Sequence, residues 1–341
     1  MIKKEPSLSD VAKKLGVSKT LVSFVLNNKG DEMGISKETQ KKVKEKAIEL
    51  NYQPNQIARG LRIGKTKTIG LIVADISNPF YARVARIIEF YAEKHAYNVM
   101  FCSSDEDENR EKVLLQMFRE RQVDGAIISS TSDNPEYIKS LIRDGFPFVL
   151  IDRYFKDIDC NFVVVDNYQA TYTSTNYLLN KGNKNIGFIT LSPSHISSLH
   201  ERKAGYLGAL NERKFEIKPA YILELDYSDV KKRNYQSIKK YFLENKELTA
   251  VFVTNNNLAV AVLKTLKELN MVVPNDIALM TFDDIDIFRI TTPSISVVAQ
   301  PVDEIGKHAV SILLDSIEKD EQQFVKKILQ TKLIIRESTS R

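Results

Sequence analysis

Polar and aromatic side chains follow the apolar runs in the larger part of this sequence, at the points where those runs end. The set is Asp75, Asn78, Phe80, Tyr81, Asp152, Arg153, Arg202, Asn255, Asn256 and Asp283. Carboxylates, amides and guanidinium groups supply both hydrogen-bond donors and acceptors, and aromatic faces add apolar contact. This mixture suits a small ligand that carries several hydroxyl groups. For any one of these residues, the alternative is a helix-capping or bridging role without a ligand.

A second set of side chains predicts contact with nucleic acid. Residues 7–27 carry two short helical patterns, with Leu8, Val11, Ala12 and Leu15 on one face and then Leu21, Val22, Val25 and Leu26 on another. Ser7 and Ser18 lie at the N-cap positions, and Gly16 separates the two patterns. This arrangement is typical of a helix-turn-helix, in which the second helix begins in the DNA major groove. We therefore expect major-groove contacts from Ser18, Lys19, Thr20, Ser23 and Phe24.

Charge supports nucleic acid as the partner of this segment. Residues 1–66 hold 14 Lys and Arg against 7 Asp and Glu, a net charge of +7, whereas the remaining 275 residues have a net charge of −2. A basic segment on a near-neutral body is the electrostatic pattern of a phosphate-binding module. A membrane surface would attract the same charge, but the segment lacks a basic helix with a continuous apolar stripe. An ordinary helical hairpin in a larger core would not need this charge.

Length and composition indicate a multidomain globular protein. A chain of 341 residues with 43% hydrophobic content favours two or three domains. No apolar run reaches the length of a membrane span, and the N-terminus has no signal-peptide core. Cys102 and Cys160 form no CxxC pair, so neither a disulfide framework nor a zinc site is expected. These features predict a cytoplasmic protein without a metal or cofactor.

The sequence lacks the motifs of the common enzymes with a comparable fold. The first apolar run is followed by no GxGxxG, and the chain has no GxxxxGK[ST] and no GxSxG. His95, His195, His200 and His308 show no compact metal spacing. We therefore expect no enzymatic activity. A transport protein that binds solutes would need an export signal and would not need residues 1–66.

The body alternates apolar, β-branched runs with helical patterns. Strands are predicted at 68–74, 97–102, 123–129, 147–152, 186–191, 221–225, 249–254 and 276–282. Helices are predicted at 79–95, 107–121, 135–144, 168–181, 202–214, 230–245 and 256–269. Repeated βα units predict the α/β class, with two doubly wound parallel sheets in two lobes. Because open parallel sheets bind ligands beyond the carboxyl ends of their strands, the polar set above is predicted to meet there.

Between the helix pair and the body lie a third predicted helix and a short segment that would be helical only when something packs against it. Ser36 caps a predicted helix from Lys37 to Leu50 whose Val43 and Ala47 can complete a three-helix core. Its lysines 41, 42, 44 and 46 belong either to a solvated face or to phosphate contacts. The stretch 53–66 contains Pro54 and Gly60 and is too short to be a stable helix alone. It is predicted to be either a hinge that orders on binding or a plain linker.

Motifs spread over the whole chain resemble those of the lactose/galactose-repressor (LacI/GalR) family of transcription regulators. They are DVAKKLGVSKTLVSFVLN at 10–27, YQPNQIARGLR at 52–62, KTIGLIVADISNPFYA at 67–82, VDGAIIS at 123–129, VLIDR at 149–153, VVDN at 164–167, ERKAGYLGAL at 201–210, AVFVTNN at 250–256, VPNDIALMTFDD at 273–284 and TPSISVVAQPVDEIG at 292–306. All of them in this order leave little room for a chance match.

The resemblance implies a division of the chain and a set of site residues. It implies a helix-turn-helix domain at 1–52, a hinge at 53–66, and a periplasmic-binding-protein-like body at 67–341. The first lobe would comprise about 67–166 and 299–325, and the second about 167–298 and 326–341. The family's effector-contacting positions fall on Phe80, Asp152, Arg202, Asn256 and Asp283. In the hinge, Leu61 would enter the minor groove as an apolar wedge, with Asn55, Arg59 and Arg62 beside it.

Three features depart from the family pattern. Phe24 stands where relatives commonly carry Arg or His, so it can pack on a thymine methyl group but cannot hydrogen-bond a guanine. The loop 28–35 is about three residues longer than usual, which leaves its role open. Asn255 and Asn256 replace the common Asn-Asp pair. The operator and the group bound near residue 256 therefore cannot be inferred from relatives.

These observations predict a ligand-controlled DNA-binding regulator, and they favour a repressor over an activator. A head of about 50 residues makes few base contacts, so a homodimer on a pseudo-palindromic operator is expected. A sugar or sugar derivative is the predicted effector. A purine or a protein corepressor is the alternative.

Overall fold

The computed structural model describes residues 6–52, 65–132, 136–192, 196–231, 235–319 and 323–340. The chain forms two compact units, Met1–Thr66 and Lys67–Arg341, which we call the head and the body. Each unit has its own buried apolar core, and each is described by itself below.

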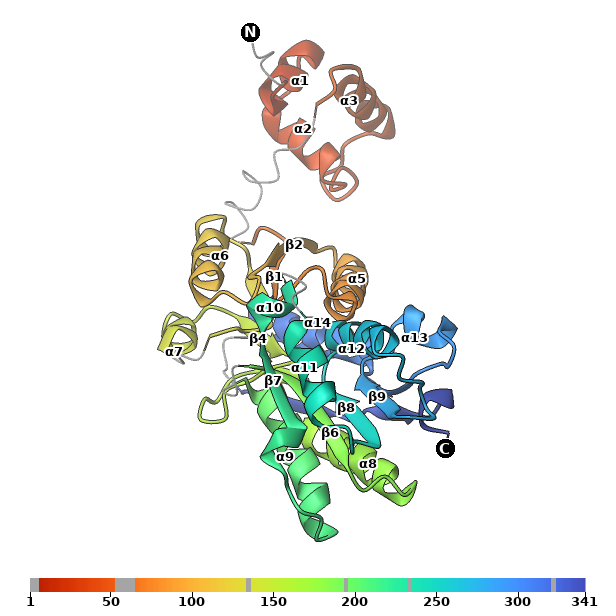
Figure 1. Ribbon diagram of the computed structural model, residues 1–341. Coiled ribbons are helices and arrows are strands. Elements are labelled where there is room, and N and C mark those ends of the chain that lie inside the picture. Colours follow the sequence, from red (N-terminus) through yellow and green to blue (C-terminus); the bar gives the residue numbers. More distant parts are fainter. Residues whose placement is uncertain are drawn as a thin grey trace. The chain divides into compact units, whose positions relative to one another are not determined.

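The head contains three helices, α1 (Leu8–Leu15), α2 (Lys19–Leu26) and α3 (Lys37–Glu49), shown in Figure 1. Ser7 and Asp10 form a reciprocal capping box, in which the Asp10 backbone N–H donates to Ser7 Oγ at 3.3 Å and the Ser7 N–H donates to Asp10 Oδ2 at 2.8 Å. Gly16 ends α1 with a φ of 66°, a left-handed conformation that glycine adopts without strain. Ser18 caps α2 by accepting from the Leu21 N–H at 3.1 Å. The predicted helix-turn-helix is confirmed.

A small core of short apolar side chains holds these helices together. Its buried members are Val11, Ala12, Val22, Val25, Val43 and Ala47. The long loop between α2 and α3 is fastened to α3 by Gln40, whose Nε2 donates to Asp31 Oδ1 and to the Ile35 carbonyl, both at 2.8 Å. A Cβ atom at Gly30 would lie 2.5 Å from Gln40 Cδ, so a larger residue there would displace the Gln40 side chain from these hydrogen bonds.

The first lobe of the body is built on a parallel sheet with the strand order β11-β5-β4-β3-β1-β2. Its strands are β1 (Thr68–Val73), β2 (Asn98–Ser103), β3 (Gly125–Ile128), β4 (Phe148–Ile151), β5 (Phe162–Val165) and β11 (Lys326–Leu329). Helices α5 (Pro79–Lys94) and α14 (Val302–Glu318) bury apolar side chains against one face, and α6 (Glu108–Glu120) and α7 (Glu136–Arg143) against the other.

The second lobe repeats this arrangement with the strand order β12-β10-β9-β8-β6-β7. Its strands are β6 (Ile186–Ser192), β7 (Ile222–Asp226), β8 (Ala250–Val253), β9 (Ala278–Phe282), β10 (Ser296–Ala299) and β12 (Lys332–Ile334), with β12 antiparallel to β10. Helices α8 (Asn167–Asn180) and α9 (Ser197–Glu212) cover one face, and α11 (Gln236–Glu244) and α12 (Asn256–Glu268) the other. Two short helices, α10 (Tyr227–Lys231) and α13 (Asp286–Ile290), follow β7 and β9. The predicted α/β class is confirmed.

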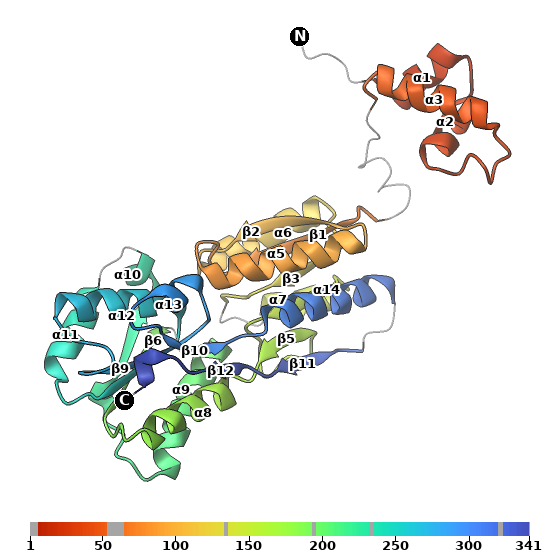
Figure 2. The same cartoon turned by 90° about the vertical axis from the view of Figure 1, so that its right-hand side faces the viewer.

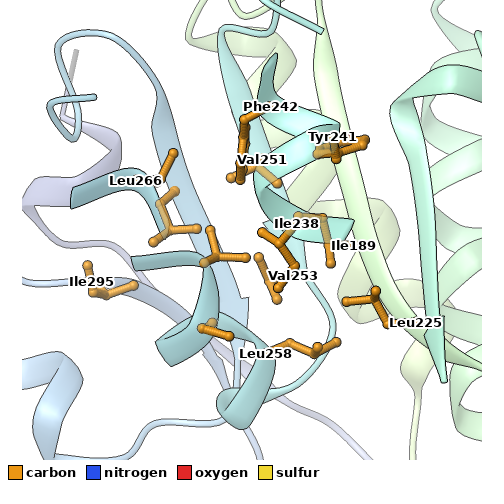
Figure 3. Close-up of a cluster of buried hydrophobic side chains, with 14 of the residues drawn as sticks. Ile189, Leu225, Ile238, Tyr241, Phe242, Val251, Val253, Leu258, Leu266 and Ile295 are labelled. Carbon is orange, nitrogen blue, oxygen red and sulfur yellow. The ribbon is translucent and has the colours of Figure 1, made fainter. Parts of the chain in front are cut away.

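The core of the second lobe shows why its strands are apolar on both faces. Figure 3 shows Ile238, Tyr241 and Phe242 of α11 with Leu258 and Leu266 of α12 around Val251 and Val253 of β8. Phe252, between those two valines, points to the opposite face and stacks against Phe188. A central strand of a doubly covered sheet has no solvent face, so its residues form a continuous apolar run.

The chain crosses between the lobes after β5, after β10 and between β11 and β12 (Figure 2). The third crossing corrects the expected boundary, which placed residues 326–341 in the second lobe. Lys326 pairs with Phe162 of β5 in parallel, so β11 belongs to the first lobe and the crossing falls between Leu329 and Lys332. Residues 326–335 read KKILQTKLII, two short apolar stretches separated by three polar residues, and this pattern does not reveal that the two stretches pair with different sheets.

Two helix predictions are also corrected. Helix α9 begins at Ser197, so Arg202 lies in its second turn and does not open the helix. The single helix expected at 230–245 is replaced by α10 and α11, and residues 232–234 between them lie outside the described part of the chain.

Candidate functional site

The start of α2 presents an open polar face in the head. Ser18, Lys19 and Thr20 are exposed, and Ser23 and Phe24 are half-buried. Val22 and Val25 point into the head core, and several partly buried apolar side chains of residues 6–52 pack against that core. Phe24 is not one of these. Phe24 lies one helical turn after Thr20 on α2, and its contact with DNA stays a prediction.

Three of the lysines of α3 pair with carboxylates along their own helix. Lys42 Nζ lies 2.7 Å from Glu38 Oε1, Lys41 Nζ lies 3.9 Å from Glu45 Oε1, and Lys46 pairs with Glu49. Most of these side chains are exposed, and ion pairs at the surface contribute little to stability because solvent screens them. They favour the solvated-face interpretation of this helix. The predicted minor-groove residues Asn55, Arg59, Leu61 and Arg62 lie outside the described residues.

A narrow cleft lies at the carboxyl ends of the strands, between the two lobes of the body. It has a volume of about 40 Å³, and residues from both lobes line it. Four of the five predicted effector residues are among them, namely Phe80, Asp152, Arg202 and Asp283. Phe80 lies in the first turn of α5 and packs edge-on against Tyr81, with ring centroids 5.1 Å apart.

Arg202 is buried and is held by neutral acceptors. Its Nε donates to Asn167 Oδ1 at 2.8 Å, and its NH1 donates to the Thr254 carbonyl at 2.7 Å. The guanidinium carbon lies 3.8 Å from the centre of the Phe282 ring, a cation–π contact. Burial lowers the pKa of Arg202, while the nearby carboxylates of Asp152 and Asp283 oppose that shift. The guanidinium is thus fixed in position with its charge still available to a ligand.

Asp152 and Asp283 face the cleft from the two lobes. Asp283 accepts from Gln300 Nε2 at 2.7 Å and from Asn256 Nδ2 at 3.0 Å, and Asp152 accepts from the Tyr81 hydroxyl at 2.8 Å. Burial raises the pKa of Asp283, and Arg202 opposes this rise. Both residues adopt left-handed backbone conformations, with φ of 64° and 69°. Such strain in non-glycine residues clusters at functional sites, where the surrounding structure holds it.

A second guanidinium in the cleft is paired from within the first lobe. Arg153 donates two parallel hydrogen bonds to Glu106, at 2.7 Å from NH1 to Oε2 and at 2.5 Å from NH2 to Oε1. Its Nε lies 3.4 Å from Asp152 Oδ2. Burial by itself would lower the pKa of Arg153. The adjacent Glu106 carboxylate outweighs this effect and raises the pKa above its ordinary value, so the group stays charged.

Asn256 does not lie where we predicted it. Asn255 and Asn257 line the cleft, whereas the Asn256 side chain is fully buried behind it. Its Nδ2 donates to Asn78 Oδ1 at 2.8 Å and to Asp283 Oδ2, and so bridges the two lobes. The cause is the start of α12, because Asn255 is the N-cap and the following helical turn directs residue 256 inward.

The cleft residues that the sequence analysis missed include three polar ones, Glu106, Tyr227 and Gln300. Each follows the carboxyl end of a strand, β2, β7 and β10 respectively. The rule that located Asp152 and Asp283 would therefore have found them if applied to every strand. Tyr227 hydrogen-bonds Asp75 across the lobes, and burial raises the pKa of Tyr227.

Further polar contacts join the lobes beside the cleft. Arg83 of α5 donates to the Asp284 carbonyl at 2.6 Å and to Asp286 Oδ1 at 2.7 Å. Tyr154 donates its hydroxyl to Glu201 Oε1 at 2.6 Å and its backbone N–H to Ser197 Oγ at 2.9 Å. The lobes are therefore in a closed arrangement, held by hydrogen bonds that would break if the cleft opened.

A helix-turn-helix with an open polar face and a two-lobed body with a charged interlobe cleft define the class of a DNA-binding regulator with a ligand-binding body. Residues 7–55 match the family model of the bacterial regulatory proteins of the lacI family, and residues 175–339 match that of the periplasmic binding protein-like domain.

Full-length relatives support the same assignment. The chain is 35% identical to the HTH-type transcriptional regulator RegA of Clostridium saccharobutylicum over 98% of this chain and 99% of the relative. It is 30% identical to the ribose operon repressor of Haemophilus influenzae over 97% and 98%. The fold matches the lac repressor dimer bound to operator and an anti-inducer, with a TM-score of 0.85, 22% identity and coverage of 98% and 99%. The chain belongs to the lacI family and is a DNA-binding transcription regulator.

The relatives are named as regulators of transcription, which are not enzymes. No helix within the described ranges is long and apolar enough to span a membrane.

Proposed function

We propose that this protein is a cytoplasmic repressor whose affinity for its operator is controlled by a small polyhydroxylated ligand, a sugar or sugar derivative, bound between the lobes of the body. The observation that carries this proposal is the cleft, where fixed carboxylates, a fixed guanidinium and the Phe80 ring converge from both lobes. Hydroxyl groups can donate to Asp152 and Asp283 and accept from Arg202. The relative named as a ribose operon repressor supports both the repressor role and the ligand class.

In the head, Ser18, Lys19, Thr20, Ser23 and Phe24 would contact the major groove. Lys19 and Thr20 are exposed at the start of α2, the part of a recognition helix that meets base edges. Phe24 would pack on a thymine methyl group. Residues 53–66 would act as the hinge, with Asn55, Arg59, Leu61 and Arg62 in the minor groove.

The protein would act as a homodimer on a pseudo-palindromic operator. The first lobe exposes Phe101 on the edge strand β2 and also exposes Ile76, Phe90 and Val113, and the second lobe exposes Ile287 and Ile290. An uncovered edge strand that carries large apolar side chains is a feature that proteins normally bury or pair. Burial of these side chains against a second copy would place two heads on one DNA.

Ligand binding would act by changing the preference between open and closed lobes. A ligand shifts such an equilibrium only by its differential affinity for the two arrangements. Contacts from both lobes to one ligand, through Asp152 on the first and Arg202 and Asp283 on the second, provide that difference. The assignment of residues 1–52 to the DNA-binding domain and of residues 53–66 to the hinge belongs to this proposal.

A purine or a protein corepressor remains the alternative control signal. A purine would need an aromatic stacking partner and an amide that pairs with its edge, and Phe80 with Asn255 would have to supply them. The inner cleft offers more carboxylates than such a planar base can use. The polyhydroxylated ligand is therefore the better fit.

The experiment has two stages. Binding-site selection on randomised DNA would first identify the operator. The full chain would then be screened by thermal shift against sugars, sugar phosphates and nucleobases, because a ligand at 100 times its Kd adds about 2.7 kcal/mol of stability. A sugar that stabilises the chain and changes operator affinity supports the proposal. Stabilisation by nucleobases alone would contradict it.

A further inference from the structure

The cleft is lined by more carboxylates than guanidinium groups. Four carboxylates, Asp75, Glu106, Asp152 and Asp283, face two guanidinium groups, Arg153 and Arg202. The cleft therefore carries a formal excess of two negative charges. In a partly buried site such an excess acts on a ligand at short range and is weakly screened by salt.

Internal pairing removes one of the two guanidinium groups from recognition. Arg153 is bound by both oxygens of Glu106, and its Nε faces Asp152. In such a bidentate pair the two terminal nitrogens of the guanidinium group already donate to a carboxylate, so they are not free to bind a phosphate or a carboxylate of the ligand. An anionic ligand would have to displace Glu106 or share Arg153 with it.

The remaining charges also favour a ligand without negative charge. The hydrogen-bond donors on Asp283, from Gln300 and Asn256, are neutral, and so are those on Asp75, from Ser77 and Tyr227. Among the described contacts neither carboxylate forms a direct ion pair, and Arg202 is bound to the neutral acceptors Asn167 and Thr254. A neutral hydroxyl or an ammonium group can donate to both.

The backbone around Glu106 is built to place this carboxylate in the cleft. Asp105 and Glu106 are two consecutive non-glycine residues with left-handed φ, 54° and 57°. A left-handed conformation costs a non-glycine residue free energy, which the surrounding contacts must offset. Asp105 is fixed by Arg110 Nη1 at 2.9 Å and by the Ser103 hydroxyl at 2.7 Å. The turn thus directs Glu106 inward to Arg153, where its side chain is 12% exposed.

We infer that the cleft selects an uncharged or amine-bearing polyhydroxylated ligand and excludes sugar phosphates and sugar acids, and that Glu106 is the residue that sets this preference. This inference rests on the proposed function, because it names the class of ligand for the same cleft. It adds a specificity role for a residue that neither the sequence motifs nor the strand-end residues identified above had included.

A groove that adjoins the cleft supports the same selection. It has a volume of about 670 Å³ and shares Asp75, Tyr227 and Asn257 with the cleft. Asp75 lies where the two spaces meet. Lys264, the one cation among the described residues that line the groove, lies 6.0 Å from the centre of the Tyr235 ring. A ligand that enters by this route meets a carboxylate before it meets Arg202.

The first test uses inorganic phosphate as the probe, so that it needs no identified effector. Thermal unfolding of the full chain is measured in phosphate and in sodium chloride of equal ionic strength, for the wild type, Glu106→Gln and the control Glu120→Gln. Glu120 is an exposed carboxylate of α6, so the control makes the same change of charge away from the cleft. We expect Glu106→Gln to bind phosphate about tenfold more tightly than the wild type, and Glu120→Gln to match the wild type. Equal phosphate affinity in all three proteins would overturn the role of Glu106.

The second test uses the wild type alone and therefore does not depend on a variant that folds. Glucose, galactose, ribose and xylose are compared with their phosphates and, for the hexoses, with their 2-amino and uronic acid forms. Stabilisation by a neutral or amino sugar, with no response to its anionic counterpart, supports the inference. An anionic form that stabilises as strongly as the neutral one overturns it and leaves a sugar effector in place. If no member of the panel stabilises the chain, the proposed sugar effector fails, and the phosphate measurement alone decides on Glu106.

Discussion

In the head, the side chains proposed to meet DNA are exposed or half-buried, whereas in the body the side chains that line the cleft are buried and hydrogen-bonded to one another. Lys19 and Thr20 extend from a helix whose own fold depends on caps and six small core residues. Arg202 and Asp283 are each held by two hydrogen bonds, and Asp283 also by a left-handed backbone.

The difference follows from the size of the two ligands. DNA is a large surface with regularly spaced charge, so flexible side chains on a rigid helix can adapt to it and gain most of their affinity from phosphates. A small molecule offers few contacts, so its affinity depends on groups that are already in position. The head therefore keeps its functional residues outside the network that folds it, and the body uses the same network for folding and for binding.

The largest effect should come from a buried carboxylate of the body. Glu111 is fully buried and accepts from Ser130 Oγ at 2.8 Å, from the Thr131 N–H and hydroxyl at 2.6 and 2.7 Å, and from the Tyr137 hydroxyl. Glu111→Ala leaves these donors unpaired and should destabilise the body by about 3 kcal/mol in urea unfolding. The exposed Glu120→Ala is the control and should change stability by less than about 0.5 kcal/mol. A cost for Glu111→Ala as small as that of the control would mean that the network is not structural.

Features that depend on neighbouring residues could be predicted from the sequence, whereas features that depend on distant contacts could not. The capped helices of the head and the apolar strands of the body could be predicted because caps and hydrophobic periodicity are local. The pairing of β11 with β5 could not, since it depends on contacts between residues more than 160 positions apart. In the cleft, Phe80, Asp152, Arg202 and Asp283 followed from strand ends and motifs. Asn256 was misplaced because its direction depends on the residue at which α12 starts. Glu106 follows the carboxyl end of β2 and was missed because the strand-end rule was not applied to that strand. Its direction into the cleft depends on the left-handed backbone of Asp105 and Glu106, which the sequence does not show.

In the head, the largest single effect should come from a cap. Ser7→Ala removes the capping-box acceptor for Asp10 N–H and should cost about 1 kcal/mol of head stability. Ser7→Gly should cost only a few tenths, roughly 0.3 kcal/mol, because glycine leaves the helix end open to water. Hydrogen exchange of the α1 amides in the full chain measures both. Equal protection in the wild type and the alanine variant would show that the cap does not limit head stability.

Lowering the pH should decrease the stability that Asp31 contributes to the head and increase the stability that Glu111 contributes to the body. In the head, the hydrogen bond from Lys37 is the main cause of a lowered pKa of Asp31, below its ordinary 3.8, so the stability that this group contributes is present above pH 3.8 and is lost as pH falls through the lowered pKa. In the body, burial raises the pKa of Glu111 above 4.5, so its contribution is present below pH 4.5 and is lost as pH rises through the raised pKa.

Calorimetry across pH 3–7 with Asp31→Asn and Glu111→Gln would separate these contributions. The free energy of unfolding of the wild type minus that of the variant should grow with pH for Asp31→Asn and shrink with pH for Glu111→Gln. Any loss of stability that does not depend on pH adds a constant to each difference. The same slope for both variants would contradict the assignment of the two shifts.

The smallest effect on stability should accompany a large effect on recognition. Phe24→Ala should change head stability by no more than about 0.5 kcal/mol and alter base preference at one position per half-site. Lys41→Ala is the matched control, expected at most to weaken binding to all sequences alike and to lower the salt dependence of binding. Binding-site selection on randomised DNA measures the base preference of both variants. An unchanged consensus for a folded Phe24→Ala would place Phe24 outside the DNA contact.

The central claim is that one ligand in the cleft controls DNA binding, and the most direct measurement is operator affinity with and without that ligand. The selected operator is titrated with the wild type, Arg202→Ala and Asp283→Ala, in the presence and absence of a sugar that stabilises the wild type. We predict that the ligand changes the operator Kd of the wild type by about tenfold or more, a coupling of about 1.4 kcal/mol. Both variants should bind the operator without ligand within about fivefold of the wild type and show no response to the ligand at that concentration. A ligand response that survives in both variants would place the control of DNA binding outside this cleft.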